Sequence, residues 1–349
     1  MPAFNMNRRT FGLGLAAAGV ALPMLNRPSF AAGAVTVATF PNAWEASYRK
    51  VIVPMLAAKG TTLNIAPALT TAQIAKVLAA KQGSAPPPYD ALLLSPGDIN
   101  VAVKHDLLAE IDPSKISNWS KLLPASQGKY GPTVTLEVDG FAYNPDVVPK
   151  PTGYKDLFEN PAFAGKVSWT GFDSNTAIEF YSEIAKIYGT GPYDMDAVFK
   201  LFKDKKDFLG PIVDTTSHQM TMLQQGEIGV FMASTNNVAQ LKSLGAKAEF
   251  VVPDTGSPAV PVEIVMVKGA LNPDAVYEYM DAAISAEAQS VLQLPPTEDI
   301  PTNSDVKLAP GIAAYVTPEQ MAKLVYLDWG VVADHRDEWT KAFDRAVKA

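Results

Sequence analysis

The chain has 349 residues, of which 48% are hydrophobic and 19% are charged, and its formal net charge at pH 7 is −7. This composition is typical of a globular protein and excludes a disordered chain. The acidic excess, without a basic cluster, argues against nucleic acid or an anionic membrane as a partner, since both require concentrated positive charge. The sequence has no cysteine, which excludes thiolate metal sites, cysteine nucleophiles and a lipid anchor attached through a thiol.

The first 31 residues have the features of an export signal. Adjacent Arg8 and Arg9 precede an apolar run over residues 11–25 and then small residues that end at Ala31. The run has about fifteen residues, whereas roughly twenty are needed to span a bilayer. We therefore expect a signal peptide over residues 1–31, the alternative being a buried first helix, and a mature protein that is free in the periplasm. The paired arginines resemble a twin-arginine signal, and the general secretory route remains open.

Strands and helices alternate through the first third of the chain. Short β-branched or apolar runs predict strands over residues 35–39, 63–65 and 91–94, and apolar spacing of three and four predicts helices over residues 44–59 and 71–80. The run 91–94 is apolar throughout, as expected for a strand buried on both faces. This alternation predicts a mostly parallel sheet covered by helices on both sides.

Two long extended runs follow, over residues 133–143 and 260–267. Runs of this length exceed what one small sheet needs, so we expect both to cross between two lobes. The sequence thus predicts an α/β fold with two lobes joined by hinge strands around a ligand cleft. The expected boundaries are residues 32–140 and 263–305 for lobe 1, and residues 141–262 and 306–349 for lobe 2.

Motifs for catalysis are absent from the sequence. It contains no glycine-rich phosphate loop, no Gly-x-Ser-x-Gly turn and no His-Glu-x-x-His. The three histidines, His105, His218 and His335, stand far apart and have no second metal ligand at useful spacing. We therefore expect a protein that is not an enzyme and that has no metal or cofactor. An exported hydrolase or lyase on the same scaffold is the alternative from another class.

Short segments spread over nearly the whole mature chain carry a family resemblance. In chain order they are Tyr89-Asp90 with Ser95-Pro96, Gly140-Phe141-Ala142-Tyr143-Asn144, Phe163-Ala164-Gly165-Lys166-Val167, Gly226-Glu227-Ile228-Gly229-Val230, Lys268-Gly269-Ala270-Leu271-Asn272-Pro273, Pro301-Thr302-Asn303 and Leu327-Asp328-Trp329. Together they resemble the extracellular solute-binding proteins of ABC importers, in particular the class of the spermidine and putrescine carriers. The resemblance implies a type II periplasmic binding protein fold, a small-molecule ligand and an ABC permease in the inner membrane as partner. We also expect a monomer.

The resemblance implies three ligand residues, each of which has a structural alternative. Glu263, on the second extended run, matches an acidic ligand position of the polyamine carriers; the alternative is an interlobe salt bridge. Asp173 matches a second acidic position, or it caps the helix that begins near residue 175. Ser95 ends an apolar strand, where ligand residues lie in open α/β sheets, and matches a family contact, or it is a helix cap.

Aromatic ligand residues match less well. Gly97, Met232 and Pro261 stand where the polyamine carriers present rings. Trp44 or Trp169 could supply a ring instead, with a position in the core as the alternative for each. A complete aromatic box is therefore not expected.

Polar groups near strand ends support a second hypothesis for the ligand. Ser234 follows a strand over residues 228–232, and Asn42 follows the first strand. Their hydroxyl and amide groups could bind by hydrogen bonds where the polyamine carriers use stacking. The acidic candidates favour a polyamine or another organic cation, whereas these polar groups favour an uncharged or anionic small solute.

Overall fold

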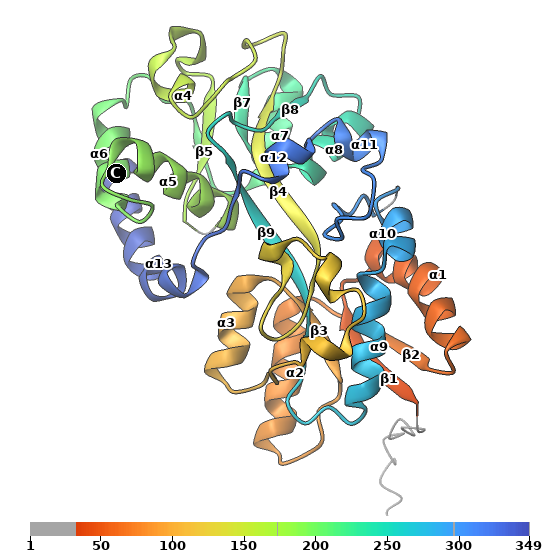
Figure 1. Ribbon diagram of the computed structural model, residues 1–349. Helices are drawn as coiled ribbons and strands as arrows, with labels where there is room; N and C mark the ends of the chain where they lie inside the picture. Colours follow the sequence, from red (N-terminus) through yellow and green to blue (C-terminus); the bar gives the residue numbers. More distant parts are fainter. Residues whose placement is uncertain (1–32, 173, 296, 349) are drawn as a thin grey trace, which may run out of the picture. The chain divides into compact units, whose positions relative to one another are not determined.

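One mixed sheet organises the described part of the chain. A computed structural model describes residues 33–172, 174–295 and 297–348, so the predicted signal peptide over residues 1–31 lies outside the described residues. The strands are β1 (Ala34–Thr39), β2 (Thr62–Pro67), β3 (Ala91–Leu94), β4 (Thr133–Tyr143), β5 (Val167–Thr170), β6 (Ile212–Val213), β7 (Val230–Ser234), β8 (Glu249–Val251), β9 (Ser257–Met266) and β10 (Leu324–Val325). They follow the order β2-β1-β3-β9-β4-β7-β5-β6, with β8 beside β4 and β10 beside β9 (Figure 1).

The first half of the sheet, β2-β1-β3, is parallel, as the alternation of strands and helices predicts. Its helices are α1 (Ala43–Ala58), α2 (Thr70–Gln82), α3 (Pro96–Lys104), α9 (Pro273–Ala283) and α10 (Ala286–Leu292). One face packs with α1 and α9 in a core that includes Val37 and Ile264. The other face packs with α2 and α3 around Leu92 and Val265. β3 is therefore buried on both faces, which confirms the expectation from its unbroken apolar sequence.

The second half of the sheet, β7-β5-β6, is also parallel. The remaining helices are α4 (Asp156–Glu159), α5 (Asn175–Tyr188), α6 (Met195–Asp204), α7 (Thr216–Gln225), α8 (Thr235–Ser243), α11 (Pro310–Ala313), α12 (Pro318–Met321) and α13 (Trp329–Phe343). An aromatic core packs α5, α6 and α13 against β5, and Trp169 lies inside it with 0% exposure. The suggestion that Trp169 could face a ligand is therefore wrong, because neighbouring rings enclose its indole. Within the described ranges no helix is long and apolar enough to span a membrane.

Strands β4 and β9 connect the two halves of the sheet. β9 pairs with β3 through residues 263–266 and with β4 through residues 259–263. β4 in turn pairs with β9 near its start and with β7 and β8 over residues 139–143. With about 3.3 Å per residue, each strand is long enough to run from one half into the other (Figure 1). The two extended runs of the sequence are thus confirmed as the longest strands of the described residues.

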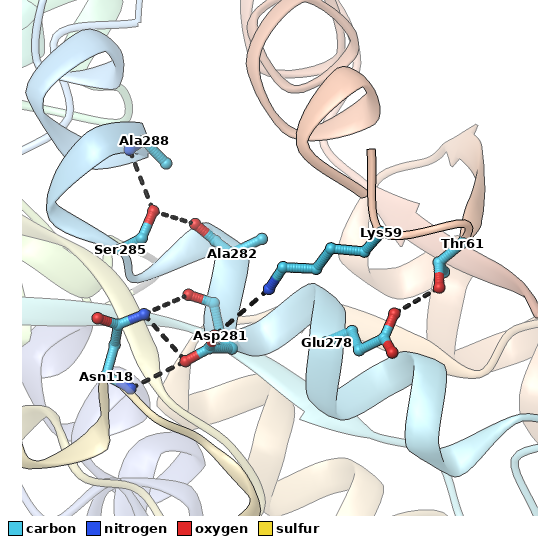
Figure 2. A network of polar contacts seen from close by, with 8 residues as sticks. All are labelled: Lys59, Thr61, Asn118, Glu278, Asp281, Ala282, Ser285 and Ala288. Carbon is cyan, nitrogen blue, oxygen red and sulfur yellow. Dashed lines mark hydrogen bonds and ion pairs between the residues drawn. The ribbon is translucent and has the colours of Figure 1, made fainter. Parts of the chain in front are cut away.

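A polar network fixes α9 against the end of α1 and the loop before β4 (Figure 2). The carboxylate of Asp281 accepts a hydrogen bond from the backbone N–H of Asn118 at 2.8 Å and one from its side-chain amide at 2.9 Å. Lys59, at the end of α1, lies 3.7 Å from the same carboxylate. One turn earlier on α9, Glu278 accepts a hydrogen bond from the hydroxyl of Thr61. This network positions the first half of the sheet and lies away from its carboxyl edge.

Candidate ligand site

The carboxyl edge of the first half of the sheet brings Ser95 and Glu263 together. Leu94, the last residue of β3, pairs with Glu263 on the antiparallel neighbour β9, so Ser95 follows one position further along the same edge of the sheet. Gly128 lies against the same side chain, because a Cβ added there would stand 2.4 Å from Oε2 of Glu263. The ligands of open α/β proteins bind at this edge of a sheet.

Glu263 is a partly buried acid without an opposite charge. In the described part of the chain no lysine, arginine or histidine forms an ion pair with it. Burial raises the pKa of its carboxyl group from 4.5 to about 7. Burial removes water from this carboxylate, and no basic side chain replaces the lost solvation energy. A cation bound beside it would stabilise its charged form. The predicted interlobe salt bridge of Glu263 is therefore not formed among the described residues.

The carboxyl edge of the second half carries a matching set of acids. Asp139 on β4 pairs with Ser234, the last residue of β7, in the same relation that Glu263 has to Leu94. Glu137 lies two residues earlier on β4, and Glu179 comes from α5, which packs beside β7 and β9. Asp139 and Glu179 are each only 1% exposed. One acid therefore stands at the equivalent place on each connecting strand.

Burial and mutual charge raise the pKa values of the acids in this second set. Burial and the charge of Asp139 raise the pKa of Glu137 to about 7, against the lowering effect of a hydrogen bond with Ser234. Burial raises the pKa of Asp139, and burial together with the charges of Asp139 and Glu137 raises the pKa of Glu179 well above its usual range. Carboxyl groups buried side by side cannot all ionise at neutral pH. They hold protons unless positive charge reaches them.

A further buried acid, Asp299, lies beside the start of α1. Burial raises the pKa of its carboxyl group well above the usual range. Its charge contributes to the raised pKa of Tyr48 on α1, after burial itself and the effect of Tyr279. Like the other four acids it forms no ion pair with a basic side chain of the described residues. The interior near the connecting strands thus holds five carboxyl groups and no matching positive charge in the described part.

Both predicted serines also have roles at helix starts. Ser95 is the N-cap residue of α3, and its hydroxyl donates to Oδ2 of Asp98 at 2.8 Å. Ser234 is the N-cap residue of α8, and its backbone N–H donates to Oδ1 of Asn237 at 3.1 Å. The helix-cap position expected as the alternative for Ser95 is therefore found, and Ser234 holds the same kind of position. Ser234 is also paired with Asp139 across the sheet.

The two predictions at the end of β1 differ in their surroundings. Asn42 is exposed, begins α1 and has a positive φ of 66°, a conformation that costs energy for a residue with a side chain. Trp44 is half-buried, with its ring between Phe40 and Tyr48 at centroid distances of 5.5 and 5.4 Å. It therefore packs on the core and keeps one part accessible. Asp173, the second acidic residue predicted to bind the ligand, lies outside the described residues.

A cavity of about 250 Å³ lies where α3, α5 and α13 meet. Ser95 and Gly97 line it from the first half, and Asn175 and Arg336 from the second. Arg336 donates to the carbonyl of Phe172 and to Oδ1 of Asn175, both at 2.9 Å. At its rim α3 contacts α13, and Figure 1 shows these helices side by side. The cavity therefore joins both halves and includes one of the predicted residues.

Sequence reasoning missed the acids on β4 and α5. Glu137 and Asp139 stand two residues apart in an extended run whose other positions are mostly apolar. That spacing places both on one face of a strand and was an available signal. Glu179 could not be recognised from the sequence, because glutamate is common on exposed helix faces and only the fold shows that this one is buried.

The architecture is that of the periplasmic binding proteins. A structure of an extracellular solute-binding protein from Bordetella parapertussis is similar with a TM-score of 0.80 and 18% identity, over 90% of this chain and 99% of that chain. The Atu4243-GABA receptor is similar with a TM-score of 0.69 and 20% identity, over 90% and 97%. MotA from A. tumefaciens B6 in complex with glucopine has a TM-score of 0.65 and 18% identity, over 90% and 99%. These likenesses confirm the α/β fold expected from the sequence.

The family follows from the sequence match. The model of the bacterial extracellular solute-binding proteins matches residues 50–320. The chain belongs to this family, whose members bind a small molecule and deliver it to an ABC transporter. No curated protein sequence matches the chain.

Proposed function

We propose that this protein binds a small organic cation, a polyamine or a related amine, in the periplasm and delivers it to an ABC permease. The observation that carries the proposal is the set of buried carboxyl groups without basic partners in the described part of the chain: Glu137, Asp139, Glu179, Glu263 and Asp299. An amine supplies the missing positive charge and can donate up to three hydrogen bonds to these oxygens. No reaction is needed to explain the site.

Closure of two lobes is part of the same proposal. We propose the boundaries given above, residues 32–140 with 263–305 and residues 141–262 with 306–349, with β4 and β9 as the hinge. The separate cores on the two halves of the sheet support this division. A ligand bound between the carboxyl edges would then hold the lobes closed. We further propose that the protein is a monomer without a lipid anchor.

A second candidate is a polar solute that carries a carboxylate. The guanidinium group of Arg336 at the cavity supports it, as do Ser95 and Asn175 on the same wall. The similar structures also include a GABA receptor and a glucopine complex. The acids favour the amine, because they outnumber this single basic group.

A thermal-shift panel of amines, amino acids, sugars and organic acids separates the two candidates. A ligand at 100 times its Kd stabilises the folded state by about 2.7 kcal/mol. We expect putrescine or spermidine to raise Tm, and Glu263→Gln to reduce that rise. A rise with an organic acid and none with any amine would contradict the proposal. A turnover assay on the same panel tests the hydrolase or lyase alternative, for which we expect no product.

A further inference from the structure

Helices α3 and α13 belong to different halves of the sheet and contact each other directly (Figure 1). Ile99 and Ala102 fix α3 in the core that covers β3. Trp329 and Val332 fix α13 in the aromatic core beside β5. Each helix is therefore held by its own half of the sheet, and their contact crosses the boundary between the two proposed lobes.

An ion pair lies at one end of this contact. Nζ of Lys104, the last residue of α3, is 3.2 Å from Oδ1 of Asp334 on α13, and both side chains are exposed. Every other ion pair that the structure describes joins two side chains of the same proposed lobe. The pair of Lys104 with Asp334 is therefore the electrostatic link between the lobes in the described part of the chain.

The rest of the contact is loosely packed. The ring of Trp329 lies against Gly97, because a Cβ added at this glycine would stand 3.7 Å from Cε3 of the indole. Beside it, the cavity of about 250 Å³ separates Val101 on α3 from Val332 and Ala333 on α13. Permanently packed interiors leave few voids larger than a water molecule. A void of this size next to an exposed ion pair indicates an interface that forms and separates, as expected between two lobes that move about a hinge.

We propose that the contact between α3 and α13 regulates ligand affinity, because the pair of Lys104 with Asp334 stabilises the arrangement in which the two lobes touch. The lobes and their hinge in β4 and β9 are those of the proposed function, on which this inference rests. A ligand that binds between touching lobes has an apparent Kd that is inversely proportional to the fraction of molecules in that arrangement. An exposed ion pair changes such an equilibrium by up to about fivefold. The ligand-free protein therefore already favours the arrangement that binds.

The distance between the lobes in the ligand-free protein tests this proposal directly. The chain has no cysteine, so spin labels attach only where cysteines are introduced, at the exposed positions Ala75→Cys on α2 and Lys203→Cys on α6. Because α2 packs beside α3 and α6 beside α13, the distance between the labels increases when the contact opens. We expect pulsed EPR to show longer distances in Lys104→Glu and a return to the wild-type distances when Asp334→Lys is added. Lys200→Glu breaks an exposed ion pair within one lobe and should keep the wild-type distances. Unchanged distances in Lys104→Glu, or no return in the double variant, would overturn the proposal.

Calorimetric titration with putrescine measures the effect on affinity. We expect Lys104→Glu and Asp334→Lys each to raise Kd by up to about fivefold, and the double variant to restore the wild-type value. A direct effect of the new charge on the bound cation would change Kd in opposite directions in the two single variants, whereas loss of the contact weakens binding in both. Opposite changes, or a wild-type Kd in both, would overturn the proposal and leave the proposed function standing. If neither putrescine nor spermidine binds the wild type, the proposed ligand is wrong, and the EPR distances still decide whether the ion pair holds the lobes together.

Discussion

Replacing Glu263 by glutamine should remove part of the pH dependence of the free energy of unfolding. The folded protein raises the pKa of this carboxyl group from 4.5 to about 7, through burial. A raised pKa means that the folded state binds its proton more tightly than the unfolded chain does. The stability associated with Glu263 is therefore fully present below about pH 4.5 and is lost as the pH rises through 7.

The size of the effect follows from the same values. The difference between 4.5 and about 7 corresponds to about 3 kcal/mol. The side chain keeps partial contact with solvent, and screening reduces the expected effect to about 2 kcal/mol. Glutamine has nearly the same shape and does not ionise. Without ligand, Glu263→Gln should lie within about 1 kcal/mol of the wild type at pH 5 and exceed its free energy of unfolding by about 2 kcal/mol at pH 8.

Urea unfolding of the ligand-free protein at several pH values between 5 and 8 measures this difference. Glu227→Gln, which removes an exposed acid on the second half, serves as the matched control and should follow the wild type. The other buried acids are shared by all three proteins, so their contributions cancel in the comparison. If wild type and Glu263→Gln lose stability in parallel over this range, then Glu263 is solvated and charged at neutral pH and the argument from burial is wrong.

Three further changes test the α9 network, the start of α8 and the glycine beside Glu263. Asp281→Ala should lower the free energy of unfolding by about 1–3 kcal/mol, because it leaves the backbone N–H of Asn118 without its acceptor; the exposed Asp274→Ala on the same helix should cost less than about 1 kcal/mol in the same urea titration. Ser234→Ala should lower stability by about 1 kcal/mol through loss of the N-cap of α8, and an unchanged Tm would contradict that role. Gly128→Ala should cost about 1–3 kcal/mol and also weaken ligand binding, since the new Cβ would stand 2.4 Å from Oε2 of Glu263. Wild-type affinity in a thermal-shift titration of that variant would show that the glycine is not needed there.

The sequence was informative wherever the signal was local. Periodicity located the strands of the first half, the helices between them and both connecting strands within a few residues. It placed Ser95 at a strand end and Glu263 on an extended run, because strand ends and extended runs can be read directly. It could not decide between the core and the cleft for Trp169, because both positions follow the same apolar pattern. The fold decided that question by packing rings around the indole on every side.

Composition and local pattern alone determined the α/β class, the acidic charge and the absence of cysteine chemistry, and they predicted export. Only the tertiary structure decided which acids act together. Asp139 and Glu179 lie forty residues apart in sequence, and their meeting depends on the register of β4 with β7 and on the packing of α5. Pairing over such a distance is fixed by the burial of the whole sheet and not by the propensity of either segment. The same burial that brings these carboxyl groups together removes them from water. Their charged forms are therefore destabilised unless a positive charge lies beside them.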